Sequence, residues 1–148
     1  MNNKIPPPIV ALICGLSIYF SRPLFSEKIY IYNNIISISF FFFGAAFLVL
    51  AVTSFKKQKT TISPLHPEKT SALVISNVFK YSRNPMYLGM LFILISLAIR
   101  YNIIGGIIAI SIFVFFITKF QIKPEEVQME KLFGEKYVLY KKRTRMWI

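Results

Sequence analysis

The feature that most constrains the fold is a run of 27 residues, 29–55, without a single charged side chain. As an α-helix, residues 35–55 alone would extend about 31 Å, which matches the hydrocarbon thickness of a bilayer. The composition agrees, because 55% of the residues are hydrophobic and the mean hydropathy is +0.54. The run therefore predicts an integral membrane protein built from helices.

Three shorter apolar runs accompany it, at Ile9–Phe20, Met86–Ile99 and Ile103–Thr118. The prolines Pro6–Pro8 can begin the first helix within the headgroup layer, since proline suits the first helical turn. A cleaved signal peptide is the competing interpretation, which a single preceding Lys and the lack of a small-x-small site disfavour. We predict an all-α integral membrane helical bundle with about four transmembrane helices.

Small residues mark the places where helices can approach one another closely. Gly44-Ala45-Ala46 follows a run of four Phe residues, and Gly105-Gly106 follows the short polar break Arg100-Tyr101-Asn102. Small side chains allow close contact between helix backbones in membranes. We expect a tight hairpin around residues 100–102, with Arg100 reaching the far interface.

The C-terminal part is predicted to be an amphipathic helix at the cytosolic face. It would begin at Pro124, with acidic residues in its first turns, and end among the basic residues 141–145, which matches the helix dipole. Met129, Phe133, Tyr137 and Tyr140 would share one face. Between the second and third spans we expect an extended loop, followed by a short surface helix over Ser71–Lys80 with Asn77 as its weak point.

Charge predicts the topology. The net charge is +12, and its basic residues flank apolar runs, which favours contact with anionic lipid over binding to nucleic acid. Four spans place fifteen Lys and Arg on one side and three on the other, so both termini are expected in the cytoplasm of a plasma or inner membrane. We interpret residues 1–148 as one domain, with a two-helix anchor (1–58) and a functional core (59–148).

The segment Tyr81–Gly89 joins a basic loop to an apolar helix. Asn84 suits an N-cap and Pro85 the first helical position, so a helix with exposed N–H groups should start at the membrane surface. Such an end can bind a carboxylate or phosphate, with Arg83 and Tyr87 beside it. An ordinary capped transmembrane helix with interfacial Arg and Tyr anchors would give the same pattern.

The acidic pair Glu125-Glu126 is expected on the same face of the membrane. A carboxylate with aromatic neighbours suits a cation, so a zwitterionic ligand could use both features. The pair could equally serve only to complement the N-terminus of its own helix. With one His and one Cys, His66 and Cys14, the sequence predicts no metal site.

Three motifs together resemble the isoprenylcysteine carboxyl methyltransferase family and its wider group, which includes the phospholipid methyltransferases. They are Arg83-Asn84-Pro85-Met86-Tyr87-Leu88-Gly89, Glu125-Glu126, and Phe133-Gly134 followed by Tyr137 and Tyr140. The resemblance covers roughly residues 61–145. It implies a small helical membrane bundle that uses S-adenosylmethionine as methyl donor and holds it at the cytosolic side.

Carried over residue by residue, the resemblance implies a set of donor contacts. They are Ser71, Ala72, Leu73, Val74, Phe79, Asn84, Pro85, Met86, Tyr87 and Glu125. Arg83 is added to them on its charge, since it could orient the donor's carboxylate or a lipid phosphate. Ser71 and Asn84 stand where the eukaryotic enzymes carry His. Gln121 stands where they have a substrate-binding Arg, which argues against a prenylcysteine carboxylate as substrate. Gln121, Glu126 and His66 are the weaker candidates for contact with the acceptor.

The predicted function is transfer of a methyl group from S-adenosylmethionine to a lipophilic or small acceptor at the cytosolic membrane face. The acceptor could be an isoprenylcysteine-like carboxylate, a lipid amine or a thiol. No residue is singled out as catalytic, because Glu126, His66 and Tyr87 are equal candidates for a base. The alternative is a non-catalytic polybasic membrane module that binds anionic lipid or a partner subunit.

Overall fold

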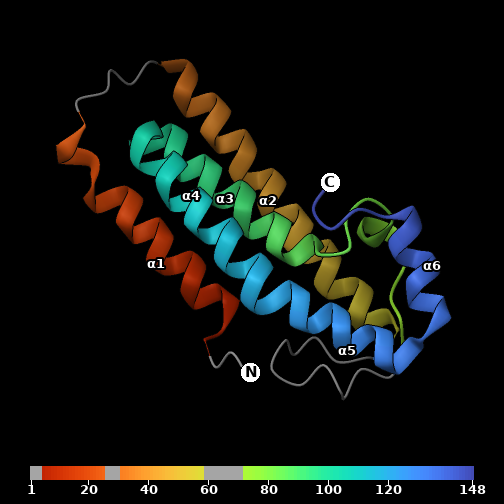
Figure 1. Ribbon diagram of the computed structural model, residues 1–148. Helices are drawn as coiled ribbons and strands as arrows, with labels where there is room; N and C mark the ends of the chain where they lie inside the picture. The colour runs from red at the N-terminus through yellow and green to blue at the C-terminus, as the bar shows by residue number, and fades with distance from the viewer. Residues whose placement is uncertain (1–4, 26–30, 59–71) are drawn as a thin grey trace.

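The computed structural model describes residues 5–25, 31–58 and 72–148. Every regular element in these ranges is helical. Four main helices, α1 (Pro7–Phe20), α2 (Ile31–Lys57), α3 (Pro85–Tyr101) and α4 (Ile103–Ile117), form an antiparallel bundle (Figure 1). Two more, α5 (Lys123–Phe133) and α6 (Glu135–Arg143), follow α4 at one end of the bundle. Short 3-10 turns cover Arg22–Leu24 and Asn77–Lys80.

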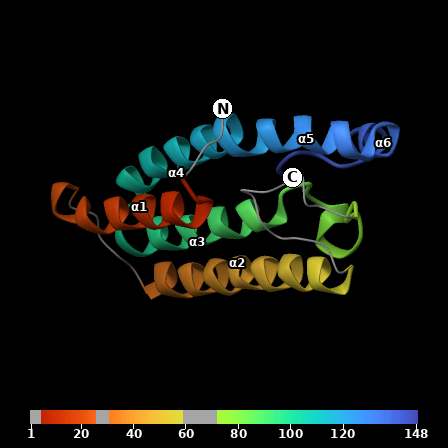
Figure 2. The same ribbon diagram turned by 90° about the horizontal axis from the view of Figure 1, so that it is seen from below.

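Helix α3 is the centre of the bundle. Viewed from below, it lies between α2 on one side and α4 on the other, with α1 packed along α3 and α4 (Figure 2). Three helical stretches are long and apolar enough to span a membrane, namely Pro7–Leu24, Tyr32–Lys57 and Ile103–Phe133. The 17 residues of α3 would extend about 25 Å, slightly less than a bilayer core, and α3 is enclosed by its neighbours. The prediction of an all-helical membrane bundle is confirmed.

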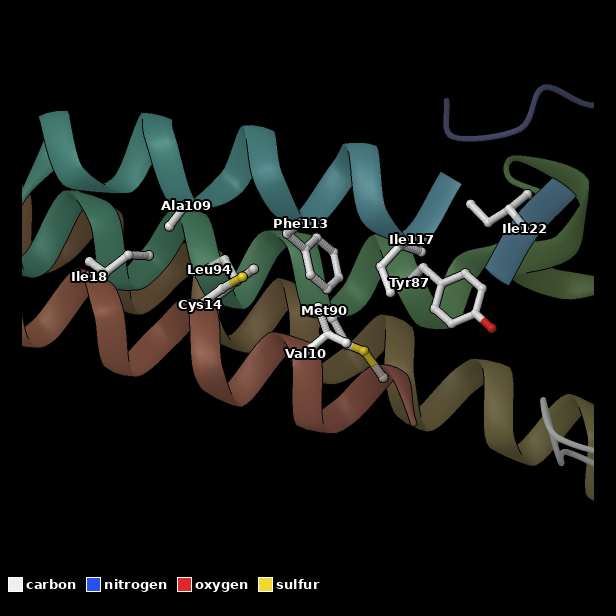
Figure 3. Close-up of a cluster of buried hydrophobic side chains, with 10 residues drawn as sticks. All are labelled: Val10, Cys14, Ile18, Tyr87, Met90, Leu94, Ala109, Phe113, Ile117 and Ile122. Carbon is white, nitrogen blue, oxygen red and sulfur yellow. The ribbon is translucent and has the colours of Figure 1, made fainter. Parts of the chain in front are cut away.

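One cluster of buried side chains joins α1, α3 and α4 along most of their length (Figure 3). Phe113, which is fully buried, lies near its middle, and Tyr87 lies at one end with its hydroxyl directed away from the cluster. Helix α1 contributes Val10, Cys14 and Ile18 to this cluster. The first helix is therefore part of the packed core of the bundle.

Glycines set the contacts of α3 with its neighbours. A Cβ placed on Gly89 would come within 2.8 Å of the Gly44 carbonyl oxygen, so α2 and α3 meet backbone to backbone. A Cβ on Gly106 would lie 2.2 Å from the Cβ of Ala98, which fixes the spacing of the α3–α4 hairpin. Both small-residue patches predicted from the sequence thus lie at close helix contacts.

The tip of the hairpin is formed by Asn102, whose side chain is fully buried. Its Oδ1 accepts a hydrogen bond from the Gly105 N–H (2.9 Å), which caps α4, and its Nδ2 donates to Ser21 Oγ (3.0 Å). The predicted hairpin is confirmed, but its break is confined to Asn102, since Arg100 and Tyr101 still belong to α3. The sequence analysis did not predict the capping role of Asn102.

The C-terminal part differs from the single predicted helix in two ways. It is divided at Gly134, whose φ of 52° ends α5 and starts α6, because a positive φ does not continue a right-handed helix. It is also continuous with α4 through a π-helical turn, Thr118–Ile122. That turn precedes Pro124, which has no N–H to donate and whose ring crowds the carbonyl four residues earlier.

The predicted surface helix over residues 71–80 is wrong within the described part, residues 72–80. Residues 73–75 have no regular secondary structure, and only Asn77–Lys80 form a single 3-10 turn. Asn77 has a φ of 55°, a left-handed conformation that Asn tolerates better than most residues and that interrupts a helix. Ser71 lies outside the described residues.

Candidate active site at the polar end of the bundle

Helices α3, α5 and α6 meet at one end of the bundle, which we call the polar end. It comprises residues 72–87, α5, α6 and the segment Thr144–Trp147, which we call the strap. Asn84 precedes the first residue of α3, as predicted, but its side chain does not cap the helix. Instead, the polar side chains around the start of α3, those of Arg83, Asn84 and Tyr87, form hydrogen bonds with α5, α6 and the strap.

The Arg83 guanidinium is the main connection among these elements. It donates to Glu126 Oε1 through Nε (3.0 Å) and Nη2 (2.5 Å), a charge-assisted pair that joins α3 to α5. Its Nη1 donates to the carbonyls of Lys141 (3.3 Å) and Thr144, at the end of α6. The side chains of Arg83 and Glu126 are only 9% and 12% exposed, so this ion pair is largely removed from water.

Lys141 extends the charged network toward the surface. Its Nζ lies 2.7 Å from Glu130 Oε1 and 3.5 Å from Glu126 Oε2. The hydrogen bond to Glu130 raises the pKa of Lys141, and the nearby charge of Glu126 acts in the same direction. Lys141 therefore stays charged and neutralises the side of Glu126 that Arg83 does not reach.

Glu125 is in a different environment from its neighbour Glu126. Tyr87 Oη donates to Glu125 Oε1 at 2.6 Å, which links the first turn of α3 to α5. Glu125 is half-buried and forms no ion pair with any residue in the described ranges. As the helical geometry of adjacent residues requires, the two carboxylates point to different partners.

The strap lies along the segment before α3. The backbone N–H of Arg83 donates to the Arg145 carbonyl (3.0 Å), and Asn84 Nδ2 donates to the Met146 carbonyl (2.9 Å). Trp147 Nε1 donates to Thr118 Oγ1 (3.3 Å) in the π-helical turn. Met146 and Trp147 also pack against the main core cluster, so the C-terminal end of the strap is anchored to the bundle.

Comparison with known proteins identifies the family. A family model described as phospholipid methyltransferase matches residues 32–136, more than two thirds of the chain. The chain belongs to the phospholipid methyltransferase family. Membership implies methyltransferase activity of the membrane phospholipid type. The match begins within α2, so it includes a span in which the sequence motifs gave no resemblance.

One curated relative adds a second similarity. An uncharacterized protein from Haemophilus influenzae is 35% identical over 63 residues, which is 43% of this chain and the whole of that relative. No solved structure matches the chain. The similarity to phospholipid methyltransferases therefore carries the functional assignment.

The donor residues expected from the family resemblance fall into two groups. Asn84, Pro85, Tyr87 and Glu125 lie together at the start of α3 and on α5. Val74 and Phe79 are instead buried in a second cluster with Ala51 of α2, and Met86 packs against that cluster. Leu73 is half-buried, as is Ala72, which has a further interaction of its own.

The weaker candidates for acceptor contact are engaged elsewhere or cannot be placed. Gln121 is buried in the π-helical turn, and its Nε2 donates to the Ile5 carbonyl (2.9 Å). Glu126 is held by Arg83 and Lys141. Arg83 was expected to contact S-adenosylmethionine. Its N–H groups instead form hydrogen bonds with Glu126 and with carbonyls at the end of α6. His66 lies outside the described residues, as does Ser71.

Two tyrosines of α6 complete the polar end. Tyr140 Oη donates to the Phe79 carbonyl (2.6 Å), which fixes the 3-10 turn against α6, and burial raises the pKa of both Tyr137 and Tyr140. Both side chains are buried, so they pack within the polar end. The strap was missed, because the resemblance ends near Arg145 and no periodicity marks an extended segment.

Proposed function

We propose that the chain transfers a methyl group from S-adenosylmethionine to the amine of a phospholipid headgroup, at the cytoplasmic face of the membrane. Family membership supports methyl transfer of the phospholipid type. The observation that carries the choice of donor is Glu125, a half-buried carboxylate held by Tyr87 and without a cationic partner in the described part of the chain.

The residues around Glu125 fit a sulfonium donor that also carries an ammonium group. A carboxylate that is partly removed from water and lacks a counter-ion favours a cationic ligand, because charge attraction strengthens as water is excluded. Glu130 and Glu126 are already neutralised by Lys141 and Arg83, which leaves Glu125 for the ligand. In the described residues no cluster of three or more His, Cys, Asp and Glu could hold a metal ion.

When bound, S-adenosylmethionine supplies an activated methyl group for direct displacement by a nucleophile. The protein then has to align the two reactants and exclude water. Tyr87 holds the Glu125 carboxylate in one orientation, and Asn84 presents its carboxamide one turn away at the start of α3. The Arg83–Glu126 pair keeps α3 and α5 together so that these groups stay in register.

The distribution of charge supports the orientation that we propose for the polar end in the membrane. Twelve described Lys and Arg residues lie at the polar end or on the helices that lead into it, whereas Arg22 and Arg100 lie at the opposite end. The positive-inside rule therefore favours a cytoplasmic polar end. An anionic phosphate of the headgroup would be attracted to the same end, while its acyl chains stay in the bilayer beside the bundle.

Calorimetry on the detergent-purified protein tests the donor. We expect saturable binding of S-adenosylmethionine to the wild type and at least about tenfold weaker binding to Glu125→Gln, which loses the charge but keeps the shape. Glu135→Gln is the matched control, because Glu135 is exposed at the start of α6. Equal affinity of Glu125→Gln and wild type would contradict this site.

Transfer of a labelled methyl group to phosphatidylethanolamine vesicles tests the acceptor. We expect labelled lipid with the wild type and little with Glu125→Gln. A folded wild type that binds no donor would instead favour a non-catalytic module that binds anionic lipid. Donor binding without lipid labelling would contradict the phospholipid amine and leave the donor site standing.

A further inference from the structure

The strap is the part of the polar end that neither the sequence motifs nor the family match explains, because the match ends at residue 136. Three consecutive residues before α3 are bound by it. Arg83 donates its N–H to the Arg145 carbonyl, and Asn84 Nδ2 and Ser82 Oγ donate to the Met146 carbonyl, at 2.9 Å and 3.4 Å. The strap therefore lies directly on the segment that carries Asn84.

The bond to Met146 determines what Asn84 can offer a ligand. A backbone carbonyl only accepts hydrogen bonds, so the Asn84 carboxamide must turn its NH₂ group toward the strap. Its Oδ1 makes no hydrogen bond to any described residue. Asn84 is thereby set to accept a hydrogen bond from a ligand N–H or O–H group, rather than to donate one to an anion.

Trp147 fixes the position of the Met146 carbonyl. It is joined to Thr118 by its indole N–H and is packed with Met146 against the core cluster that contains Tyr87 and Ile117. Thr118 lies in the π-helical turn between α4 and α5. The strap thus ties the start of α3 to the same helical junction that leads to Glu125.

We propose that Met146 and Trp147 are positioning residues for the methyl donor: the strap holds the Asn84 carboxamide with its carbonyl oxygen toward an N–H or O–H group of the donor. This rests on the proposed function, since it assumes that the donor binds beside Asn84 and Glu125. Loosening the strap should weaken donor binding and raise the donor KM, while kcat at saturating donor changes little.

The chain contains one Trp, so Trp147 fluorescence reports directly on the strap. Thr118→Val removes the hydrogen bond to the indole at nearly constant volume and keeps the reporter. We expect acrylamide to quench Trp147 more strongly in this variant, together with about threefold weaker binding of S-adenosylhomocysteine by calorimetry. Trp147→Ala removes the anchor entirely and should weaken binding by about tenfold or more.

Two controls make the result specific. Ile148→Ala changes the exposed neighbour of Trp147 and should leave both quenching and affinity unchanged. Trp147→Phe keeps most of the packing and should recover part of the affinity lost in Trp147→Ala. Thermal unfolding of each variant distinguishes a loosened strap from a bundle that has lost its fold, and Thr118→Val carries the test if Trp147→Ala does not fold.

The outcomes separate this inference from the proposed function. Suppose that the wild type binds the donor and that Thr118→Val shows stronger quenching of Trp147. Unchanged or tighter donor binding by this variant would then overturn the positioning role. Tighter binding would mean that the strap obstructs the site. Folded wild type that binds no donor would overturn the proposed donor and this inference with it.

Discussion

In the membrane-spanning bundle, α2 and α3 meet through the glycines Gly44 and Gly89, whereas at the polar end α3, α5 and α6 meet through the guanidinium of Arg83. The first contact depends on shape, because lipid offers no hydrophobic drive for helices to associate and dispersion requires close approach. The second depends on charge in a largely buried setting. The two regions should therefore fail under different substitutions and respond differently to pH.

The largest expected effect is at the charged junction. Arg83→Met would leave the buried Glu126 without its main partner and the carbonyls at the end of α6 unpaired. Removing one member of a buried ion pair typically costs about 3–5 kcal/mol, so we expect a destabilisation of that order. Thermal or denaturant unfolding in detergent measures it.

A second substitution tests the explanation. In Arg83→Met with Glu126→Leu, no buried charge is left unpaired, and part of the lost stability should return. Lys142→Met is the control, since Lys142 is exposed on α6 and should change stability little. If Arg83→Met were as stable as Lys142→Met, the polar end would not be held together by charge.

The charged junction also shows where sequence reasoning stops. That Arg83, Asn84, Tyr87, Glu125 and Glu126 would meet at one end of the bundle followed from hydropathy and charge. Which carboxylate pairs with Arg83 did not follow, because the choice depends on the rotation of α5 after the π-helical turn, and no sequence pattern gives that rotation.

The bundle was more readily predicted than the polar end. Long uncharged runs and small-residue patches are strong local signals, so residues such as Gly44 and Gly106 were assigned correctly to helix contacts. The break at Gly134 and the path of the strap depend on one residue with positive φ and on hydrogen bonds between distant segments. Neither leaves a periodic pattern in the sequence.

The next prediction tests the shape-dependent region with two matched glycines. Gly89→Ala places a Cβ 2.8 Å from the Gly44 carbonyl oxygen, where only backbone movement gives relief. Gly15→Ala places one 3.1 Å from Leu97 Cδ1, the end of a side chain that can rotate away. We expect Gly89→Ala to be the less stable of the two by about 2 kcal/mol, the usual cost of overpacking.

Both glycines lie within helices, so both variants gain similar helix propensity. The difference between their free energies of unfolding therefore reports the cost of the steric contact. Unfolding of both variants in the same detergent measures it. Equal stability would mean that α2 and α3 can separate at no cost and that the backbone contact does not define the bundle. Donor binding by Gly89→Ala should fall only by the fraction of protein that is unfolded, because the Gly44–Gly89 contact lies between α2 and α3 and not at the polar end.

The smallest expected effect is a pH dependence confined to the polar end. The pKa of Lys141 is raised above its usual value, chiefly by its hydrogen bond to Glu130. The stabilisation from a raised lysine pKa is fully present below the unfolded-state value, about 10.4, and is lost as the pH rises through the folded-state value. Stability should therefore decline above about pH 10, and Lys141→Gln should show a shallower decline than the wild type.

Tyr137 and Tyr140 are buried and their pKa values are also raised, so they too make the protein less stable as the pH rises. Both tyrosines are present in the wild type and in Lys141→Gln, so their contribution cancels in the comparison. Parallel unfolding profiles of the two proteins between pH 8 and about pH 11 would place Lys141 outside the charged network, whereas the Gly89→Ala penalty should stay constant across that range because it involves no titrating group.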